Sequence, residues 1–262
     1  MKYLDLKLIC YKPNNSSLRF TKLINRNILS KIKPNKQLST RLKKFGGRNN
    51  LGRQTNFNKG GGSKQLYRIL HKINDDFKGI LCTIEYDPIR SGLIGCIFNW
   101  LSYDFMYVLL PTNVTIGHII GFSEFNSKLY VGYQYRLKNI PVGFLIFNID
   151  FIYCKSAGVY GIILQHTKKW SLILLPSGYK LKINSNKKAF LGSVSNSNWR
   201  FRVLGKAGRI RNLGLRPKVR GIAMNPVDHP HGGRSNGGRH PVTPWGKPTK
   251  GCKKVYSSVV EQ

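Results

Sequence analysis

The chain has 262 residues, with 44 Lys or Arg against 10 Asp or Glu, and a formal net charge of +34 at pH 7. Self-repulsion of that size destabilises a compact state, so a free-standing folded enzyme is disfavoured unless a partner supplies negative charge. Nucleic acid is the first candidate partner, and an anionic membrane surface is the second.

The first segment, residues 1–65, shows no sustained hydrophobic periodicity, and no acid occurs between Lys7 and Asn74. We expect an extended, locally ordered basic arm over residues 1–65. A flexible linker is the alternative, but spacers are usually Gly/Ser-rich or of mixed charge. The glycine-rich end of this segment instead carries Arg48, Arg53, Lys59 and Lys64. It contains no G-x-x-x-x-G-K-[ST] motif, which disfavours a nucleotide hydrolase.

Short runs rich in β-branched and aromatic residues follow, at 80–87, 92–99 and 105–111. Turn signals separate them, which indicates a small antiparallel barrel. An oligonucleotide-binding-type barrel fits residues 66–138, although spacing alone does not distinguish it from other small barrels. A short helical turn is an alternative near residues 115–120.

A second set of runs lies at 144–151, 157–165, 170–175 and 180–184. Pro176, Ser177 and Gly178 between the last two are a hairpin turn signal. We expect a second small β-barrel over residues 139–200. Acids are absent from Phe151 to Val227, so this barrel is basic, whereas residues 75–155 are nearly balanced in charge.

The last segment, residues 201–262, is rich in Gly, Pro, Arg and Lys, and Asp228 is its one acid between residues 202 and 250. Such a composition cannot bury enough apolar surface to form a core. It suits a chain laid against a polyanion, because glycine permits close backbone approach and arginine holds phosphate in a planar fork. The lone Trp245 could stack on a base or ribose, or anchor the tail to protein.

The sequence Asp228-His229-Pro230-His231 permits three interpretations. Pro230 favours an extended His229, which places both imidazoles on one side of the chain. A metal would need further ligands, for which Asp228, His240 and Cys252 are candidates without a convincing motif. A general base at His229 lacks a visible nucleophile. The third interpretation, imidazoles that hydrogen-bond RNA or lock a turn, is the one we favour.

Two tail motifs resemble a known family. LGKAGRIRNLGLRPKVRGIAMNPVDHPHGG (204–233) and HPVTPWGKPTKG (240–251) are similar to the signature of the bacterial-type large-subunit ribosomal protein 2 family. SAGVYGIILQ and LPSGYKLKI resemble its second barrel. GGRNNLGRQTNFNKGGGSKQLYRI and IEYDPIRSG resemble its arm and first barrel. The match covers most of residues 41–254 and is loose over 1–40 and 99–140.

The resemblance implies a mainly β protein in which an oligonucleotide-binding-type barrel is followed by an SH3-like barrel, with both extensions threaded into large-subunit rRNA. It implies rRNA binding, support of subunit association at the inter-subunit bridge with the small subunit, contacts with neighbouring ribosomal proteins, and a reach toward the peptidyl-transferase region. It implies no catalytic residue, no protein-bound metal and no cofactor beyond rRNA-associated Mg²⁺. The RNA-binding residues would be Arg48, Arg53, Lys64, Lys206, Arg209, Arg211, Arg216, Arg220, Met224, Asn225, Asp228, His229, His231 and Trp245.

The chain also departs from the family pattern. The family usually continues HPHGG with a further Gly and a Glu, whereas here residues 234–239 read RSNGGR. The usual basic C-terminus is replaced by VYSSVVEQ (255–262), and Ser63 stands where the family has a His. These departures fit a diverged organellar ribosome.

Composition bears on location. Five scattered cysteines without a C-x-x-C pair favour a reducing compartment. No apolar run approaches the ~20 residues of a membrane helix, and the N-terminus is a poor transit peptide. The bias toward Asn, Lys, Ile, Phe and Tyr is typical of an AT-rich organellar gene. We expect the mitochondrial matrix, with a plastid as the alternative. The rival functions are a hydrolase using Asp228, His229 and His231, and a membrane-surface adaptor.

Overall fold

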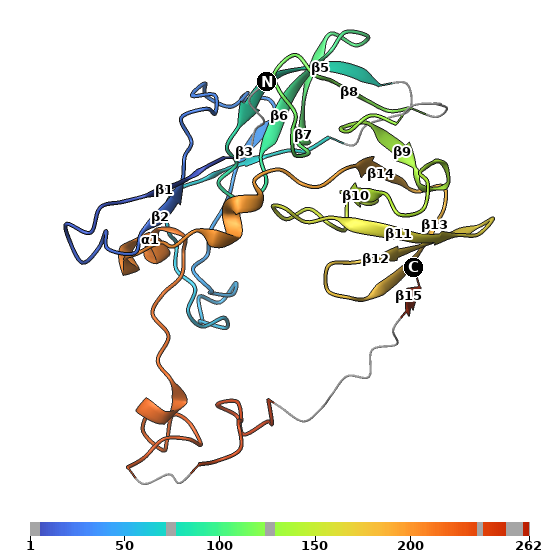
Figure 1. The fold of residues 1–262 in the computed structure, drawn as a ribbon. Coiled ribbons are helices and arrows are strands. Elements are labelled where there is room, and N and C mark those ends of the chain that lie inside the picture. The colour runs from blue at the N-terminus through green and yellow to red at the C-terminus, as the bar shows by residue number, and fades with distance from the viewer. Residues whose placement is uncertain (1–5, 72–76, 124–128, 235–237, 250–258, 262) are drawn as a thin grey trace. The chain divides into compact units, whose positions relative to one another are not determined.

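The computed structural model describes residues 6–71, 77–123, 129–234 and 238–249, and the backbone of 259–261 (Figure 1). The protein is mainly β, as predicted. Contacts group the chain into two units. The first, here called the body, consists of Met1–Lys43, Lys64–Arg209 and Ser258–Gln262. The second, here called the basic lobe, consists of Lys44–Ser63 and Ile210–Ser257. The division into four consecutive segments stays a prediction.

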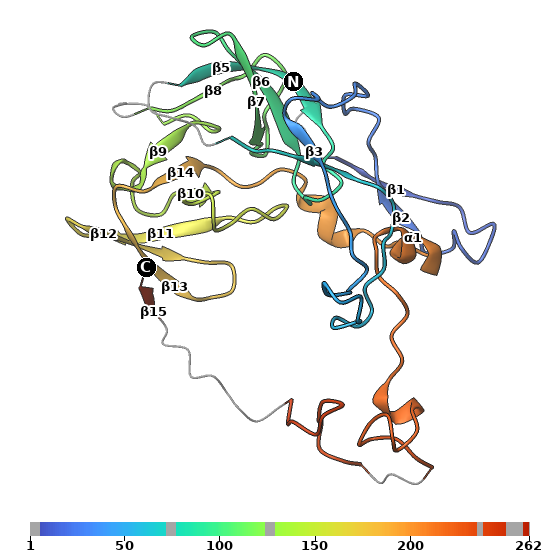
Figure 2. The same cartoon turned by 180° about the vertical axis from the view of Figure 1, so that it is seen from behind.

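The first sheet of the body has the strand order β7-β6-β5-β8 and is antiparallel throughout (Figures 1 and 2). Its strands are β5 (Lys78–Glu85), β6 (Ile94–Asn99), β7 (Asp104–Leu109) and β8 (Ile119–Gly121). Strands β5, β6 and β7 coincide with the predicted runs, since the β-branched and aromatic residues of those runs favour extended strands. The helical turn considered near 115–120 is not formed: this stretch is a turn followed by β8.

The second sheet has the order β15-β13-β12-β11-β10-β14-β9. Its strands are β9 (Gln134–Arg136), β10 (Leu145–Phe147), β11 (Gly161–His166), β12 (Trp170–Leu174), β13 (Lys180–Asn184), β14 (Lys188–Leu191) and β15 (Val259–Glu261). The predicted turn between β12 and β13 is confirmed: Gly178 N–H donates to the Leu175 carbonyl over 2.9 Å. Strand β9 belongs to this sheet through its pairing with β14, whereas the sequence analysis placed its residues in the first barrel.

The two sheets share one hydrophobic core. Phe147 and Phe190 of the second sheet, and Val194 from the segment after β14, pack with Leu81, Ile97 and other residues of the first sheet. Polar contacts reinforce this junction: Leu93 N–H donates to Ser195 Oγ over 3.1 Å, and Asn196 Nδ2 donates to the Ser91 carbonyl over 2.7 Å. The barrels therefore form one body with a continuous interior. A second hydrophobic cluster, which includes Ile146, Ile163 and Ile173, fills the interior of the barrel formed by the second sheet.

Much of the N-terminal segment belongs to the body. Strands β1 (Leu8–Cys10) and β2 (Lys22–Ile24) form a hairpin, and β3 (Ser39–Arg41) pairs with β4 (Leu66–Arg68). Leu6, Ile24 and Leu29 are buried in the shared core. Residues 44–63 leave the body between β3 and β4.

Helical structure is sparse. The structure contains the 3-10 helices η1 (Leu137–Asn139), η2 (Ser197–Phe201) and η3 (Gly221–Ala223), and the α-helix α1 (Ala207–Asn212). No helix in the described parts of the chain has the length and apolar character needed to span a membrane.

Candidate nucleic-acid interface

The basic lobe is built by pairing the glycine-rich arm with the start of the tail. Gly60 N–H donates to the Gly214 carbonyl over 2.7 Å, and Ser63 N–H donates to the Asn212 carbonyl over 2.9 Å. Arg216 N–H donates to the Asn58 carbonyl over 3.0 Å. Gly62 has φ +61°, and a Cβ there would lie 2.7 Å from the Asn212 carbonyl oxygen. Only glycine permits this approach, so the glycines join two basic segments that are far apart in sequence.

A compact loop over residues 45–56 presents two of the predicted arginines. The Asn49 side chain accepts hydrogen bonds from Arg53 N–H over 2.9 Å and Leu51 N–H over 3.1 Å. Thr55 N–H and Asn56 N–H both donate to the Gly47 carbonyl. Arg48 and Arg53 are exposed on this loop. Their backbones are fixed by local turns while their guanidinium groups stay free to meet an anion.

An exposed aromatic pair joins arm and tail within the lobe. The rings of Phe57 and Trp245 have centroids 6.4 Å apart, and their side chains remain 55% and 72% exposed. Trp245 sits in a turn in which Thr243 N–H donates to the Lys247 carbonyl over 2.8 Å. Trp245 therefore contacts protein and keeps much of its surface open, an arrangement that suits stacking on an unpaired base.

Residues 221–233, which include His229 and His231, fold into a compact set of turns, here called the histidine loop. His229 is 8% exposed, and its Nδ1 accepts the His231 N–H over 3.0 Å. Gly232 N–H donates to the His229 carbonyl over 2.8 Å, and Gly233 N–H donates to the Met224 carbonyl. Because Nδ1 accepts a hydrogen bond, the neutral imidazole carries its proton on Nε2. This geometry agrees with the favoured interpretation, in which His229 locks a turn.

The metal and hydrolase alternatives gain no support from this geometry. Among the described residues, no three His, Cys, Asp or Glu side chains gather as a metal site would require. His231 Nε2 lies 2.9 Å from the His240 carbonyl, and Asp228 is exposed. Cys252 lies outside the described residues.

The remaining predicted residues divide by environment. Arg211, Arg216 and Arg220 are exposed in the basic lobe. Lys64 and Lys206 are exposed on the body, whereas Arg209 is half-buried and donates to the Leu204 carbonyl and to Thr21 Oγ1. Met224 is half-buried and Asn225 exposed, and the Asn225 carbonyl accepts the N–H groups of Asp228 and His229. Arg209, Met224 and Asn225 thus contribute contacts within the protein, and their contacts with RNA stay predictions.

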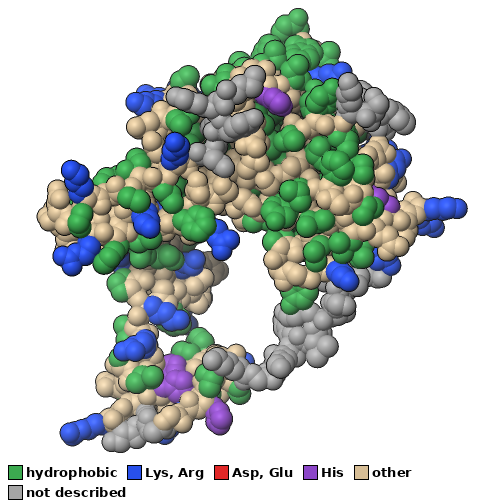
Figure 3. Space-filling model, viewed as in Figure 1, with side chains coloured by type: hydrophobic (Ala, Val, Ile, Leu, Met, Phe, Trp, Pro, Cys, Tyr) green, Lys and Arg blue, Asp and Glu red, His purple; other side chains and the backbone are tan. Residues whose placement is uncertain are grey.

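The charge of the lobe is almost entirely of one sign. Residues 44–63 contain four Lys or Arg and residues 210–249 contain seven, with Asp228 as the one acid in these ranges. Figure 3 shows Lys and Arg side chains distributed over the lobe beside the histidines. Such a surface attracts phosphate and repels other cations.

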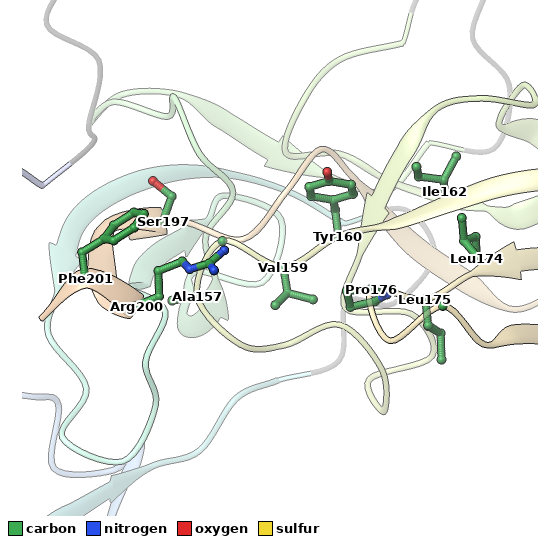
Figure 4. A pocket seen from close by; sticks show the side chains of 12 residues that line it. Ala157, Val159, Tyr160, Ile162, Leu174, Leu175, Pro176, Ser197, Arg200 and Phe201 are labelled. Atoms are coloured by element: carbon green, nitrogen blue, oxygen red, sulfur yellow. The ribbon is translucent and has the colours of Figure 1, made fainter.

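The sequence did not indicate a hollow of about 740 Å³ on the body. Three separate stretches line it: residues 157–162, 174–178 and 197–201, where η2 lies. Figure 4 shows Tyr160, Val159, Pro176 and Leu175 along its wall, with the Arg200 side chain extending toward Val159. The Arg200 guanidinium lies 5.4 Å from the centre of the Phe201 ring. Only the fold brings these residues together.

Comparison with known proteins gives a consistent result. Residues 35–121 match the family described as Ribosomal Proteins L2, RNA binding N-terminal domain, and residues 130–246 match Ribosomal Proteins L2, C-terminal domain. The chain is similar to proteins named large ribosomal subunit protein uL2. It is 43% identical to that of Wolbachia pipientis wMel over 253 residues, covering 93% of this chain and 92% of the relative. It is 43% identical to that of Orientia tsutsugamushi over 267 residues, covering 95% and 94%, and 38% identical to that of Aliarcobacter butzleri over 254 residues, covering 93% and 92%.

Proposed function

Because the chain belongs to the ribosomal protein L2 family, we propose that it is a structural constituent of the large ribosomal subunit that binds large-subunit rRNA directly. The observation that carries this proposal is the basic lobe, in which backbone hydrogen bonds join two Gly-rich segments and no apolar core forms among the residues that the structure describes. Every residue of the two hydrophobic clusters belongs to the body. Burial of apolar side chains therefore contributes little to the stability of the lobe. Neutralisation of its positive charges by RNA phosphates supplies the stabilisation instead.

The lobe is suited to fill a crevice between RNA helices. Its exposed arginines can hold phosphates through planar forks, and its glycines let the main chain approach the RNA backbone. Phe57 and Trp245 offer a stacking surface. The body adds the hollow beside η2, which suits an unstacked nucleotide because it combines apolar walls, Tyr160 and Phe201 with the single cation of Arg200. Positioning and charge neutralisation account for this activity without a catalytic group.

We extend the proposal to finer roles on the strength of the tail motifs. The stretch 204–233 resembles the family signature closely. We therefore assign to the tail the reach toward the peptidyl-transferase region, and to the protein the support of subunit association at a bridge with the small subunit. Neighbouring ribosomal proteins and rRNA-associated Mg²⁺ would complete the environment, because folded RNA needs divalent cations at its phosphates.

The names of the relatives support a location in the ribosome, and the compartment that holds this ribosome is our proposal. The relatives named above are bacterial. A mitochondrial ribosome of bacterial ancestry fits this similarity and the Asn, Lys, Ile, Phe and Tyr bias, and a plastid ribosome is the alternative.

Sedimentation of native organelle extracts tests this function. We expect the protein to migrate with large-subunit particles in a sucrose gradient, and RNase treatment to release it. Matched gradients of mitochondrial and plastid extracts would separate the two compartments. Migration away from ribosomal particles, or release that does not depend on RNase, would overturn the proposal.

A further inference from the structure

Two walls of the hollow beside η2 are tied to one residue of the first barrel, Ser91. Its Oγ accepts the Ala157 N–H over 3.0 Å, and its carbonyl accepts Asn196 Nδ2, just before η2, over 2.7 Å. Gly158 lies against η2, since its φ is +68° and a Cβ there would lie 2.9 Å from Ser197 Cα. Only glycine fits that position. The hollow is therefore preformed, which lowers the entropic cost of binding a ligand in it.

The third wall is the outer face of the second sheet. Ile162 of β11 and Leu174 of β12 line the hollow and are cross-strand partners. Lys180 of β13 is the partner of Leu174 on its other side and is exposed. Because directly opposite residues of antiparallel strands point to the same face, Lys180 stands on the face that lines the hollow. Figure 4 shows Ile162 and Leu174 at one end of the hollow, and Arg200 and Phe201 of η2 at the other.

The charge of this site is positive. None of the residues that line the hollow is acidic, and Arg200 is the charged one. Arg200 is exposed and has no carboxylate partner among the described residues. Glu261 of β15 stands beside Lys182 in the strand register, so we assign no ligand to Lys182. Arg200 and Lys180 thus remain as two cations that can meet an anionic ligand.

The walls indicate which anion fits. Tyr160 and Phe201 are 42% and 57% exposed, and Val159 and Pro176 add apolar surface between β11, β12 and η2. An RNA duplex presents phosphates outward and cannot fill an apolar hollow, whereas an unpaired nucleotide carries both a flat base and a phosphate. An acidic peptide would use the cations and leave the aromatic rings unstacked. The volume of about 740 Å³ lies in the range of sites for single small molecules, ~300–1,000 Å³.

We propose that the hollow and the adjoining face of β12 and β13 bind one unpaired segment of rRNA, with a single extruded nucleotide in the hollow. The base lies against Tyr160 and Phe201, and Arg200 holds the phosphate of this nucleotide. A neighbouring phosphate of the same strand meets Lys180. The inference rests on the proposed function, because the large-subunit particle supplies the RNA. It adds an RNA contact that the body forms without the basic lobe.

Photo-crosslinking in purified large-subunit particles tests the occupant of the hollow. Phe201→benzoylphenylalanine keeps an aromatic ring at this site. Val142→benzoylphenylalanine is the control, because Val142 is similarly exposed, at 54%, and does not line the hollow. We expect position 201 to crosslink to one unpaired nucleotide that position 142 does not reach. Crosslinking of position 201 to paired RNA alone, to a protein or to nothing would overturn the inference. If the unmodified protein does not migrate with particles, the proposed function fails instead.

A charge variant measures how firmly the crosslinked nucleotide is held. Arg200→Gln removes the cation that we assign to its phosphate. We expect acylation of its ribose 2′-hydroxyl by N-methylisatoic anhydride, which reacts with mobile nucleotides, to rise about ten-fold in the variant particles. The reason is that losing a charge-assisted hydrogen bond costs ~1.4 kcal/mol or more.

Lys168→Gln is the matched control for this measurement. It removes the same charge from an exposed residue between β11 and β12, at the opposite end of β12 from Leu174. The reactivity of the nucleotide should stay unchanged in these particles. Equal reactivity in the Arg200 and Lys168 variants would contradict the assignment of this nucleotide to the hollow.

Discussion

The environment of His229 shows how glycines determine the role of a polar side chain. A Cβ at Gly221 would lie 2.6 Å from His229 Nδ1, and a Cβ at Gly232 would lie 2.3 Å from the Asn225 carbonyl oxygen. Both distances are shorter than real contacts allow, so the histidine loop can adopt this conformation only because these two positions are glycine. The imidazole then acts as an internal acceptor that holds the tail in one shape for the RNA to meet.

Gly232→Ala should therefore weaken rRNA binding without removing any charge. The added methyl group meets backbone atoms that cannot rotate away, so we expect a cost of about 1–3 kcal/mol and a loss of affinity of about ten-fold or more. Gly238→Ala is the matched control, because a Cβ there meets nothing within 4 Å. Filter binding to an rRNA fragment compares the two variants. Equal affinities would show that the conformation of the histidine loop does not matter for rRNA binding.

At the scale of elements, runs of β-branched and aromatic residues bounded by turn signals predicted the longer strands and missed most of the short ones. Strands such as β5, β12 and β13 carry enough residues to stand out as separate runs between turn signals. Strands β8 and β9 have three residues each, too few for a pattern, and β9 joins the second sheet only through its pairing with β14. The same limit hid the pairing of residues 58–63 with 212–216, which depends on backbone groups that leave no trace in composition.

Gly62→Ala tests that pairing. The substitution places a side chain at φ +61°, which costs about 1–2 kcal/mol, and directs it at Asn212 and Gly214. Gly61→Ala is the matched control, since nothing lies within 4 Å of its Cβ. In rRNA-bound protein, we expect faster amide exchange at Ser63 and Arg216 in Gly62→Ala alone. A change confined to the arm, with Arg216 unaffected, would show that arm and tail do not support each other.

At the scale of the molecule, composition separated the core-forming residues from the charged ones only in part. It predicted the two barrels, and no described residue after 200 belongs to either hydrophobic cluster. It did not show that residues before 44 belong to the body, because Leu6, Ile24 and Leu29 are isolated apolar residues whose burial depends on the sheet they cover. The predicted site residues were found by a motif resemblance, whereas the hollow arises from the packing of three separate stretches of the chain.

This partition predicts two stabilities in one chain. Without RNA, we expect amides of β11 and β12, which surround the buried Ile163 and Ile173, to resist hydrogen exchange, since opening them exposes core. Amides of 44–63 and 210–234 should exchange rapidly, because their hydrogen bonds are exposed and like charges repel. Adding rRNA should protect the lobe and leave the body unchanged. Exchange mass spectrometry on the full chain measures both. A lobe that is as protected as β11 in the absence of RNA would mean that it folds by its own contacts, and that phosphate neutralisation is not what orders it.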